Sequence, residues 1–568
     1  MASDNPAAPD HSATAATTAA AAAGDISTGA RAAFDAAVDD YLHQVYDEDP
    51  AEASFLGLTE YDHQAKELTA AAFARRERAL LGWLDRFESF DLAPLSHDQQ
   101  VDLNLLKASL GSRVATRDFE GWRRSIAPYL GNGVFELFAH GNRPEEEAVA
   151  AAIDRIGAIG DSVAATKANI DPELADPTMC REWGVRNAAA QASFLRQGLG
   201  SFVADDKLRA RLETAGAGAA VHYDDLAQWV GELADRATGS FVFGEARYDA
   251  VLRIGEGFDF GAQDVRRMGH EEIARLDAEM STLANRIGGS TDWHAVMAKV
   301  SETKRPQSMD DMLRIYRDET HRAQEFVRAQ GILKLPAGES CKVEPSPLFY
   351  RAAIPVASYY PPAFFGPPTA GQFNVPFTLD TATDEEQVDR LRSNSFLEIP
   401  AITAHEAYPG HHGHFAILAT AGLSPIRAVL GSTYMIEGWG LYAEQMMGEF
   451  GFYETDVGRL GQMGTRIFRA GRMVVDTSLH LGEMTPEEAV TFMVERVGLP
   501  EATARGEVLR YCMRPTQASA YLTGAMEIER MAARWVEGGR GTLPDFHLAL
   551  LSSGMLPLGV AAQAIGLS

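Results

Sequence analysis

Between residues 29 and 288, hydrophobic residues recur at steps of three and four, and charged residues occupy many of the positions between them. This spacing places apolar side chains on one face of an α-helix, so it predicts one helix after another. The clearest examples are residues 69–90, 145–167, 181–198 and 208–237. Pro and Gly fall mainly between these segments, where helices end. We therefore predict a helical N-terminal region over residues 28–288.

The pattern changes after two further helical segments. Residues 335–380 are rich in Pro, Gly and aromatic side chains, and within them 343–347 and 371–377 alternate in the manner of short strands. Prolines stand at the ends of these strands, as edge strands tolerate. Helical spacing returns at about residue 395 and continues to the end. The predicted fold class is mainly α, with a small β-sheet inserted into a second region, residues 289–568.

The first 27 residues are rich in Ala and Thr. They contain no Lys or Arg before their apolar part and carry Asp4 and Asp10, so they do not fit a signal peptide. We predict a disordered tail over residues 1–27. No later apolar run approaches the ~20 residues that span a bilayer, which favours a cytoplasmic protein.

Composition and charge narrow the choice of partners. Hydrophobic residues make up 46% of the chain and charged residues 23%, as in an ordinary globular protein. Acidic residues outnumber basic ones by 79 to 51, which argues against nucleic acid and anionic membranes as partners because both need a basic face. The three cysteines form no C-x-x-C pair, so neither a disulfide framework nor a thiolate zinc site is expected. Nothing in the sequence indicates an oligomeric state.

The most informative segment is residues 402–415, ITAHEAYPGHHGHF. It holds His405, His411, His412 and His414. Glu406 directly follows the first histidine. Neutral imidazole is the usual zinc ligand, and a Glu beside a ligand His is placed to take a proton from the water that the metal activates. The segment predicts a zinc site with Glu406 as general base; the alternative is a His-rich helix edge without a chemical role.

The spacing of these histidines departs from H-E-x-x-H, in which residues i and i+4 share one helix face. His411 lies six residues after His405, a rotation of about 240° on a regular helix, so the two rings would not converge. Pro409 has no N–H to bond to the carbonyl of His405, and Gly410 tolerates unusual dihedral angles, so the helix can bulge here. Re-phased in this way, His411 is the second ligand, and His412 is the alternative.

Downstream, residues 434–444 read YMIEGWGLYAE and place Glu437 and Glu444 on one helix face. Glu437 follows two apolar residues, so we expect it to be buried, and a buried carboxylate is paired, protonated or bound to metal. Two histidines and a later glutamate form a catalytic zinc set that leaves the fourth position for water. Glu444 is then placed to hydrogen-bond a ligand imidazole. The alternative is a pair of solvated or salt-bridged glutamates.

A third segment, residues 510–524 (RYCMRPTQASAYLTG), gathers polar side chains around a proline. They are Arg510, Tyr511, Arg514, Gln517 and Tyr521. A hydrolase that forms a tetrahedral oxyanion needs a donor opposite the metal, and a Tyr hydroxyl can supply it. The alternative is that these tyrosines, at helical intervals, are part of the core.

Taken together, these blocks resemble the bacterial family catalogued as domain of unknown function 885. The resemblance rests on PGHH (404–412), EGWGLYAE (437–444), P-x-Q-x-x-x-Y-x-x-G (515–524), YYPP (359–362) and G-x-F-N (371–374). That family is distantly similar to the carboxypeptidase Taq and thimet oligopeptidase groups of gluzincins. In those groups H-E-x-G-H precedes a helix with E-x6-E, whose first Glu binds zinc, and Glu437 matches that Glu.

The resemblance carries further implications for the fold and the site. It implies a two-lobed, mostly helical body with a deep active-site channel, and peptide hydrolysis as the activity. The Taq group has a P-T-Y-x-L-G segment, which YLTG resembles, and this makes Tyr521 the preferred oxyanion donor. The chain departs from the usual family pattern at Gly413–His414, where Leu-Gln is common, and at Thr516, where Gly is common.

We therefore predict a zinc-dependent hydrolase that cleaves a peptide bond, with Zn²⁺ held by His405, His411 and Glu437. In this reading the strand residues Gly371, Phe373 and Asn374 pair with an extended substrate, and polar residues of the third segment bind it. Those residues are Arg510, Arg514 and Gln517, of which either arginine could hold a substrate carboxylate. Two alternatives remain: a metal enzyme acting on a small-molecule amide or ester, or on a bond-forming step, and a non-catalytic helical binding protein.

Overall fold

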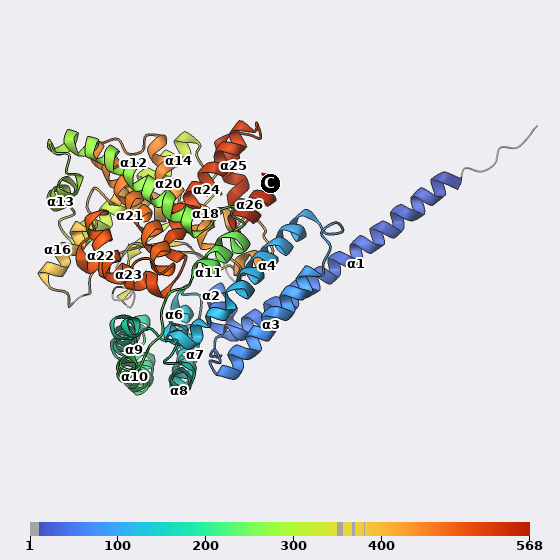
Figure 1. Ribbon diagram of the computed structural model, residues 1–568, viewed down its shortest axis with the longest axis horizontal. Coiled ribbons are helices and arrows are strands. Elements are labelled where there is room, and N and C mark those ends of the chain that lie inside the picture. The colour runs from blue at the N-terminus through green and yellow to red at the C-terminus, as the bar shows by residue number, and fades with distance from the viewer. Residues whose placement is uncertain (1–10, 349–350, 352–355, 366–369, 380, 568) are drawn as a thin grey trace, which may run out of the picture.

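The computed structural model describes residues 11–348, 351, 356–365, 370–379 and 381–567, and side chains from residue 27 onward. Helices make up most of this part of the chain, and three short strands form one small sheet (Figure 1). The prediction of a mainly α fold with a small inserted sheet is confirmed. Within the described residues no helix is long and apolar enough to cross a membrane. The deep channel stays a prediction.

The N-terminal helices form two hydrophobic clusters of their own. One cluster, with Phe34 and Leu106, lies among the first helices, and the other, with Val149 and Leu226, lies among the later ones. The helices are α1 (His11–Glu48), α2 (Pro50–Leu56), α3 (Ala70–Glu88), α4 (His97–Thr116), α6 (Val134–Phe138), α7 (Glu145–Gly157), α8 (Ile159–Asn169), α9 (Val185–Gln197) and α10 (Asp206–Ala234). Polar caps mark several of their starts, for example the capping box of Ser96 and Gln99 at α4.

Helix α1 differs from the predicted disordered tail. It begins at His11 and projects from the rest of the molecule as a single long helix (Figure 1). Its first half is rich in Ala, the residue with the highest intrinsic helix propensity, which accounts for helix where low hydrophobicity predicted disorder. The remainder of the predicted tail, residues 1–10, lies outside the described residues.

The C-terminal helices build a smaller cluster, with Met493 and Val508, and one large core, which also takes in side chains of α4. They are α11 (Glu245–Ala250), α12 (Ala262–Gly288), α13 (Trp293–Thr303), α14 (Met309–Gln330), α16 (Asp384–Arg392), α17 (Ile399–Glu406), α18 (His411–Leu418), α19 (Pro425–Val429), α20 (Thr433–Glu449), α21 (Asp456–His480), α22 (Pro486–Glu495), α23 (Glu501–Met513), α24 (Gln517–Glu537), α25 (Leu543–Ser552) and α26 (Leu558–Ala564). This core begins at Phe243 along that part of the chain, so the predicted boundary at residue 288 is placed too late. Helical spacing shows which face of α12 is buried but not which partner buries it.

The small sheet has the strand order β1–β3–β2. Strand β1 (Lys342–Pro345) runs parallel to β3 (Gln372–Val375), and β2 (Ser358–Tyr360) runs antiparallel to it. The predicted strands at 343–347 and 371–377 are therefore present. The second of them is the central strand and not an edge strand, because β2, which the pattern did not predict, lies beside it.

Helices α20 and α24 cross at very short range near the centre of this body. A Cβ at Gly438 would lie 2.7 Å from the carbonyl carbon of Gly524, and a Cβ at Gly524 would lie 2.1 Å from the carbonyl oxygen of Tyr434. Only glycine allows the two backbones to approach this closely. This crossing explains the first glycine of EGWG and the last residue of YLTG, and it brings Glu437 and Tyr521 into one neighbourhood.

A buried ion pair joins the N-terminal helix α4 to α19. Arg427 donates from Nε to Asp102 at 2.6 Å, and from Nη1 to the carbonyl of Ser553 at 3.1 Å. Both charged side chains are nearly fully buried, at 5% and 7% exposed. Asp98 also approaches Arg427, at 3.4 Å, but its side chain is 83% exposed. The pair with Asp102 therefore fastens the two parts of the molecule, and the pair with Asp98 adds little.

We expect Asp102→Ala to lower the free energy of unfolding by about 3–5 kcal/mol, because it leaves the Arg427 guanidinium buried without its carboxylate. The matched change Asp98→Ala should alter it by less than about 0.5 kcal/mol. Chemical denaturation followed by circular dichroism measures both. Equal losses in the two variants would contradict this assignment.

Candidate metal centre

The helix that carries the histidines is interrupted rather than bulged. Helix α17 ends at Glu406 and α18 begins at His411, with residues 407–410 between them. Two backbone hydrogen bonds that span six residues, instead of the usual four, cross this loop. Gly410 N–H donates to the carbonyl of Ala404 at 3.0 Å, and Gly413 N–H donates to that of Ala407 at 3.1 Å. The interruption re-phases the chain, so the rings of His405 and His411 lie 4.7 Å apart, nearly perpendicular to each other.

Trp439 holds this interruption in place from α20. Its indole Nε1–H donates to the carbonyls of Pro409, at 3.0 Å, and Gly410, at 3.2 Å, and its side chain is completely buried. These carbonyls face away from regular helical partners, and a buried carbonyl without a donor is costly. A Cβ at Gly410 would lie 1.9 Å from the carbonyl oxygen of His405, so this position requires glycine.

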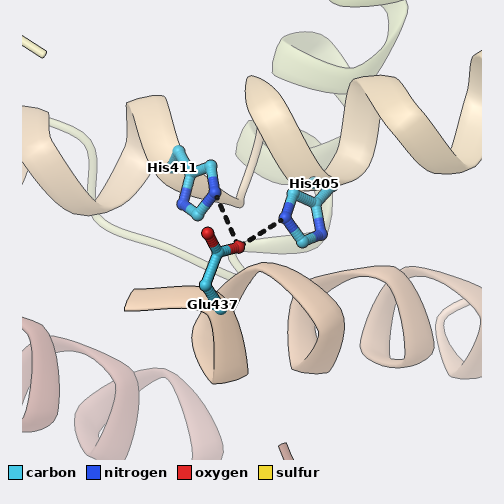
Figure 2. Close-up of side chains that lie close together, drawn as sticks. All are labelled: His405, His411 and Glu437. Carbon is cyan, nitrogen blue, oxygen red and sulfur yellow. Dashed lines mark hydrogen bonds and ion pairs between the residues drawn. The ribbon is translucent and has the colours of Figure 1, made fainter. Parts of the chain in front are cut away.

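His405, His411 and Glu437 form a converging donor set. Figure 2 shows both imidazoles directed at the carboxylate, with the histidines on separate helices and Glu437 on a third. Their Nε2 atoms lie 3.3 and 3.6 Å from Oε2 of Glu437, and one donor atom from each residue falls within 4.8 Å of the others. Two zinc bonds of ordinary length at the tetrahedral angle separate their donor atoms by about 3.3 Å. The two histidine–glutamate separations are therefore close to this value, and the third separation is within 4.8 Å.

The hydrogen bonds of His405 explain why this set calls for a cation. Nδ1 of His405 lies 2.8 Å from the carboxylate of Glu444, which can only accept, so Nδ1 carries a hydrogen. In the neutral ring Nε2 then presents a lone pair to the Glu437 carboxylate, which also offers only lone pairs. A proton or a metal ion must lie between them. Burial lowers the pKa of His405, but Glu437 and Glu444 outweigh it and raise the pKa to about 10. The two carboxylates therefore stabilise a positive charge at this position.

The rings of His405 and His411 differ in the hydrogen bonds that hold them in place. Glu444 is itself fixed by the Thr465 hydroxyl, which donates to its second carboxylate oxygen, and its side chain is 1% exposed. Gly440 leaves room for the ring of His405, since a Cβ there would lie 2.6 Å from Cε1. Nδ1 of His411 has no such carboxylate and is buried without a partner in the described structure. The predicted role of Glu444 as hydrogen-bond partner of a ligand imidazole matches this geometry.

His412 belongs to a different network and points away from the donor set. Its Nε2–H donates to Glu339 at 2.8 Å and its Nδ1 accepts from the Tyr359 hydroxyl at 3.1 Å, so both nitrogens are occupied. The Tyr408 hydroxyl donates to the same carboxylate at 2.6 Å. His414 is fully buried, and burial lowers its pKa to about 3. Of the two histidines between which the sequence left the choice open, His411 is the one that lies with His405 and Glu437.

Glu406 and Tyr521 flank the donor set. Glu406 follows His405 at the end of α17; burial raises the pKa of its carboxyl, Glu437 adds to the rise, and the two histidines and Arg469 oppose it. The Tyr521 ring stacks on that of His405 with centroids 6.4 Å apart. Burial, with the charge of Glu437, raises the pKa of Tyr521 to about 12. The phenol therefore keeps its hydrogen at neutral pH and can donate a hydrogen bond.

The predicted substrate-binding role of the strand at 371–374 is wrong. Because β3 is the central strand, both of its sides are already paired, with β1 and with β2. Phe373 is completely buried in the core, and Asn374 accepts a hydrogen bond from Gln372 at 2.6 Å. Gly371 is needed for another reason, since a Cβ there would lie 1.9 Å from the hydroxyl oxygen of Tyr359. Of the two edge strands, β2 carries Tyr359, whose ring lies 6.4 Å from that of His411.

Two of the predicted substrate-binding side chains are already paired with protein groups. Arg510 donates a hydrogen bond to Gln517 at 2.5 Å and another to Glu507 at 2.8 Å. Arg510 and Gln517 are therefore hydrogen-bonded to each other. Arg514 is exposed at the end of α23. The spacing in the sequence placed these residues near the break in the helices but did not show their partners.

Comparison with known proteins identifies the family. The family model described as "Bacterial protein of unknown function (DUF885)" matches residues 50–565. The chain belongs to this family. The resemblance to domain of unknown function 885 is thereby confirmed, and the more distant likeness to zinc peptidases stays a prediction. Among curated proteins none matches the chain.

Two solved structures have the same fold as this member of the DUF885 family. One is a "putative lipoprotein of unknown function" from Shewanella oneidensis, 20% identical, with a TM-score of 0.76 over 93% of this chain and 99% of that one. The other is a "putative lipoprotein" from Colwellia psychrerythraea, 18% identical, with a TM-score of 0.77 over 96% and 98%. At this identity the likeness shows the fold alone.

Sequence reasoning missed several residues that support the centre in this DUF885 protein. Glu339 lies in a loop before the sheet, where no periodicity marks it, and Thr465 lies in the middle of α21 among many residues of similar type. The EGWG block did contain a signal, since a Trp between two glycines marks a tightly packed helix. It predicted neither the hydrogen bonds of Trp439 nor the ring of His405 against Gly440.

We expect one zinc ion per chain in the purified protein, lost in His405→Gln, His411→Gln and Glu437→Gln. The matched change His412→Gln should retain zinc, because His412 contacts Glu339 and Tyr359 instead of the donor set. Elemental analysis by mass spectrometry after dialysis measures the metal. Zinc that survives in His411→Gln and disappears in His412→Gln would overturn the ligand assignment.

Gly440→Ala should weaken zinc binding by about 10- to 100-fold, because the new Cβ displaces the His405 ring from Glu444 and Glu437. Gly506→Ala is the matched control, since a Cβ at this helical position meets nothing within 4 Å. Competition with a zinc-binding dye gives both dissociation constants. An unchanged constant in Gly440→Ala would show that the ring has room to move.

Proposed function

We propose that this protein is a zinc-dependent hydrolase that cleaves an amide bond of a peptide. The observation that carries the proposal is the convergence of His405, His411 and Glu437 on one point. The Glu406 carboxyl is close enough to this set for both histidines and Glu437 to shift its pKa. A zinc ion held by these three side chains supplies Lewis acidity and lowers the pKa of water toward ~7. The centre has the composition of catalytic zinc sites, which use three protein ligands and leave a position for water or substrate.

The side chains around the centre divide the proton chemistry between them. Glu406 takes the proton from the attacking water and later delivers it to the leaving amine. Its pKa, raised by burial, lies closer to neutrality than that of a solvated Glu, which suits a group that both accepts and returns a proton. Tyr521 keeps its hydrogen and donates it as a hydrogen bond to the oxygen on which negative charge develops.

Strand β2 supports a peptide as the substrate. It is an edge strand whose Tyr359 ring lies 6.4 Å from the ring of His411. An extended peptide can add to such an edge by main-chain hydrogen bonds, which hold the backbone without selecting its side chains. The N-terminal helices steady this strand, because Tyr360 packs against Phe55 and Phe135, and Phe365 N–H donates to the carbonyl of Leu56 at 2.8 Å.

We expect Glu406→Gln to retain zinc and to lower peptide hydrolysis by about 10²- to 10⁴-fold, because the amide cannot accept the proton of water. Glu449→Gln, an exposed change on α20, is the control and should leave the rate unchanged. Incubation of a mixed-sequence peptide library with each protein, read by mass spectrometry, measures the cleavage.

The same experiment separates this function from its alternatives. Equal cleavage by the parent and by Glu406→Gln would rule out Glu406 as the base. A parent that binds zinc but cleaves no peptide would direct attention to a small-molecule amide or ester. A parent that binds no zinc even after the metal is added would leave a non-catalytic binding protein.

A further inference from the structure

Arg469 is a half-buried cation beside the metal centre for which the hydrolytic scheme has no use. It lies on α21, one helical turn after Thr465, and its guanidinium carbon is 5.8 Å from the ring centroid of Tyr521. Its Nη1 donates to the carbonyl of Thr465 at a long 3.3 Å, and its Nε is buried without any partner in the described structure.

The neighbouring arginines of α21 are paired quite differently. Arg466 donates to Glu272 and to Glu529, the latter at 2.8 Å, and Arg472 donates to Glu507 at 2.8 Å and to the Tyr511 hydroxyl at 3.1 Å. No carboxylate among the described residues forms an ion pair with Arg469. Removing a guanidinium from water is costly unless an anion accompanies it. Because Arg469 has no such anion among the described residues, we expect its partner to come from outside the chain.

The position of Arg469 indicates where such a partner would lie. The Tyr521 ring stacks on that of His405, and the Arg469 guanidinium also lies near the Tyr521 ring. An anion bound to Arg469 would therefore lie one aromatic ring from the donor set, within the length of one or two residues of an extended peptide.

The charge balance behind Arg469 favours an anion there. Arg472 and Arg510 both donate to the single carboxylate of Glu507, so this pair of guanidinium groups is not fully neutralised by it. Arg472 lies 4.7 Å from the Tyr521 ring, close to the same region. The positive field of these two arginines strengthens the binding of an anion at Arg469, because the site is partly shielded from water.

We propose that Arg469 binds a carboxylate of the substrate and so selects peptides that carry one next to the bond to be cut. The proposal rests on the proposed hydrolase function and names its substrate class. The planar guanidinium presents two parallel N–H donors that match the two oxygens of a carboxylate. The carboxylate can be the free C-terminus of the peptide or the side chain of an Asp or Glu.

Three N-terminally labelled peptides of one sequence test this. The first ends in a free carboxylate, the second ends in an amide, and the third ends in an amide but carries a Glu side chain near that end. Binding to the zinc-loaded Glu406→Gln protein is measured by fluorescence anisotropy, so that slow hydrolysis does not interfere. At least one carboxylate peptide should bind about 10- to 100-fold more tightly than the neutral one, the size of a hydrogen bond to a charged group.

Arg469→Met should abolish this preference and leave the binding of the neutral peptide unchanged. Arg469→Lys should keep part of it, because a lysine retains the charge but not the bidentate fork. Arg459→Met is the matched control, an exposed arginine on the same helix, and should keep the full preference. Zinc content and thermal unfolding confirm that each variant is folded and loaded.

The outcomes separate this inference from the function on which it rests. Preference for the free C-terminus identifies a carboxypeptidase-like specificity, and preference for the Glu peptide identifies an acidic side chain; both support the role of Arg469. No preference in the parent, or a preference that survives in Arg469→Met, overturns it. Carboxylate-dependent binding in a parent that hydrolyses none of the peptides would overturn the hydrolase and leave Arg469 as the anchor of a binding site.

Discussion

The whole centre depends on one interruption of the helical backbone. Two histidines six residues apart cannot face a common point from a regular helix, and the loop at 407–410 turns them together. Trp439 stabilises this loop by donating hydrogen bonds from the adjacent helix to two of its carbonyls. The same helix carries Glu437, so the residue that supports the interruption and the residue that completes the donor set are held in one rigid element.

The two carboxylates near this interruption differ in how deeply they are buried. Glu444 faces His405 from within the core and is held by Thr465, whereas Glu437 is partly exposed and faces both imidazoles. One carboxylate therefore orients a ring, and the other is free to share a cation with it. A separate hydrogen-bond network joins His412 to Glu339 and to Tyr359. Because Tyr359 belongs to β2, this network links α18 to the small sheet.

The N-terminal helices contact both the small sheet and α19. Tyr360 of β2 packs among aromatic rings of the first helices, while its neighbour Tyr359 contacts the histidines. Alternate residues of a strand point to opposite faces, so one short strand carries both contacts. The buried pair of Arg427 and Asp102 makes a second connection. The arrangement of the N-terminal part therefore affects the position of strand β2, although none of the donor residues comes from that part.

The sequence by itself determined the helical class, the small inserted sheet and the types of residue at the centre, because helical period, proline content and ligand chemistry are local properties. It also placed both glutamates on the face that contacts His405, since a seven-residue step on one helix preserves the face. It could not choose between His411 and His412, nor show that the strand at 371–374 is central. It could not show that Arg469 forms no ion pair with any carboxylate among the described residues. These outcomes depend on which distant segment lies against each group, for example Glu339 against His412 and strand β2 against the strand at 371–374. Only the packing of the tertiary structure brings such segments together, because nothing in the local sequence of either partner encodes the distance between them.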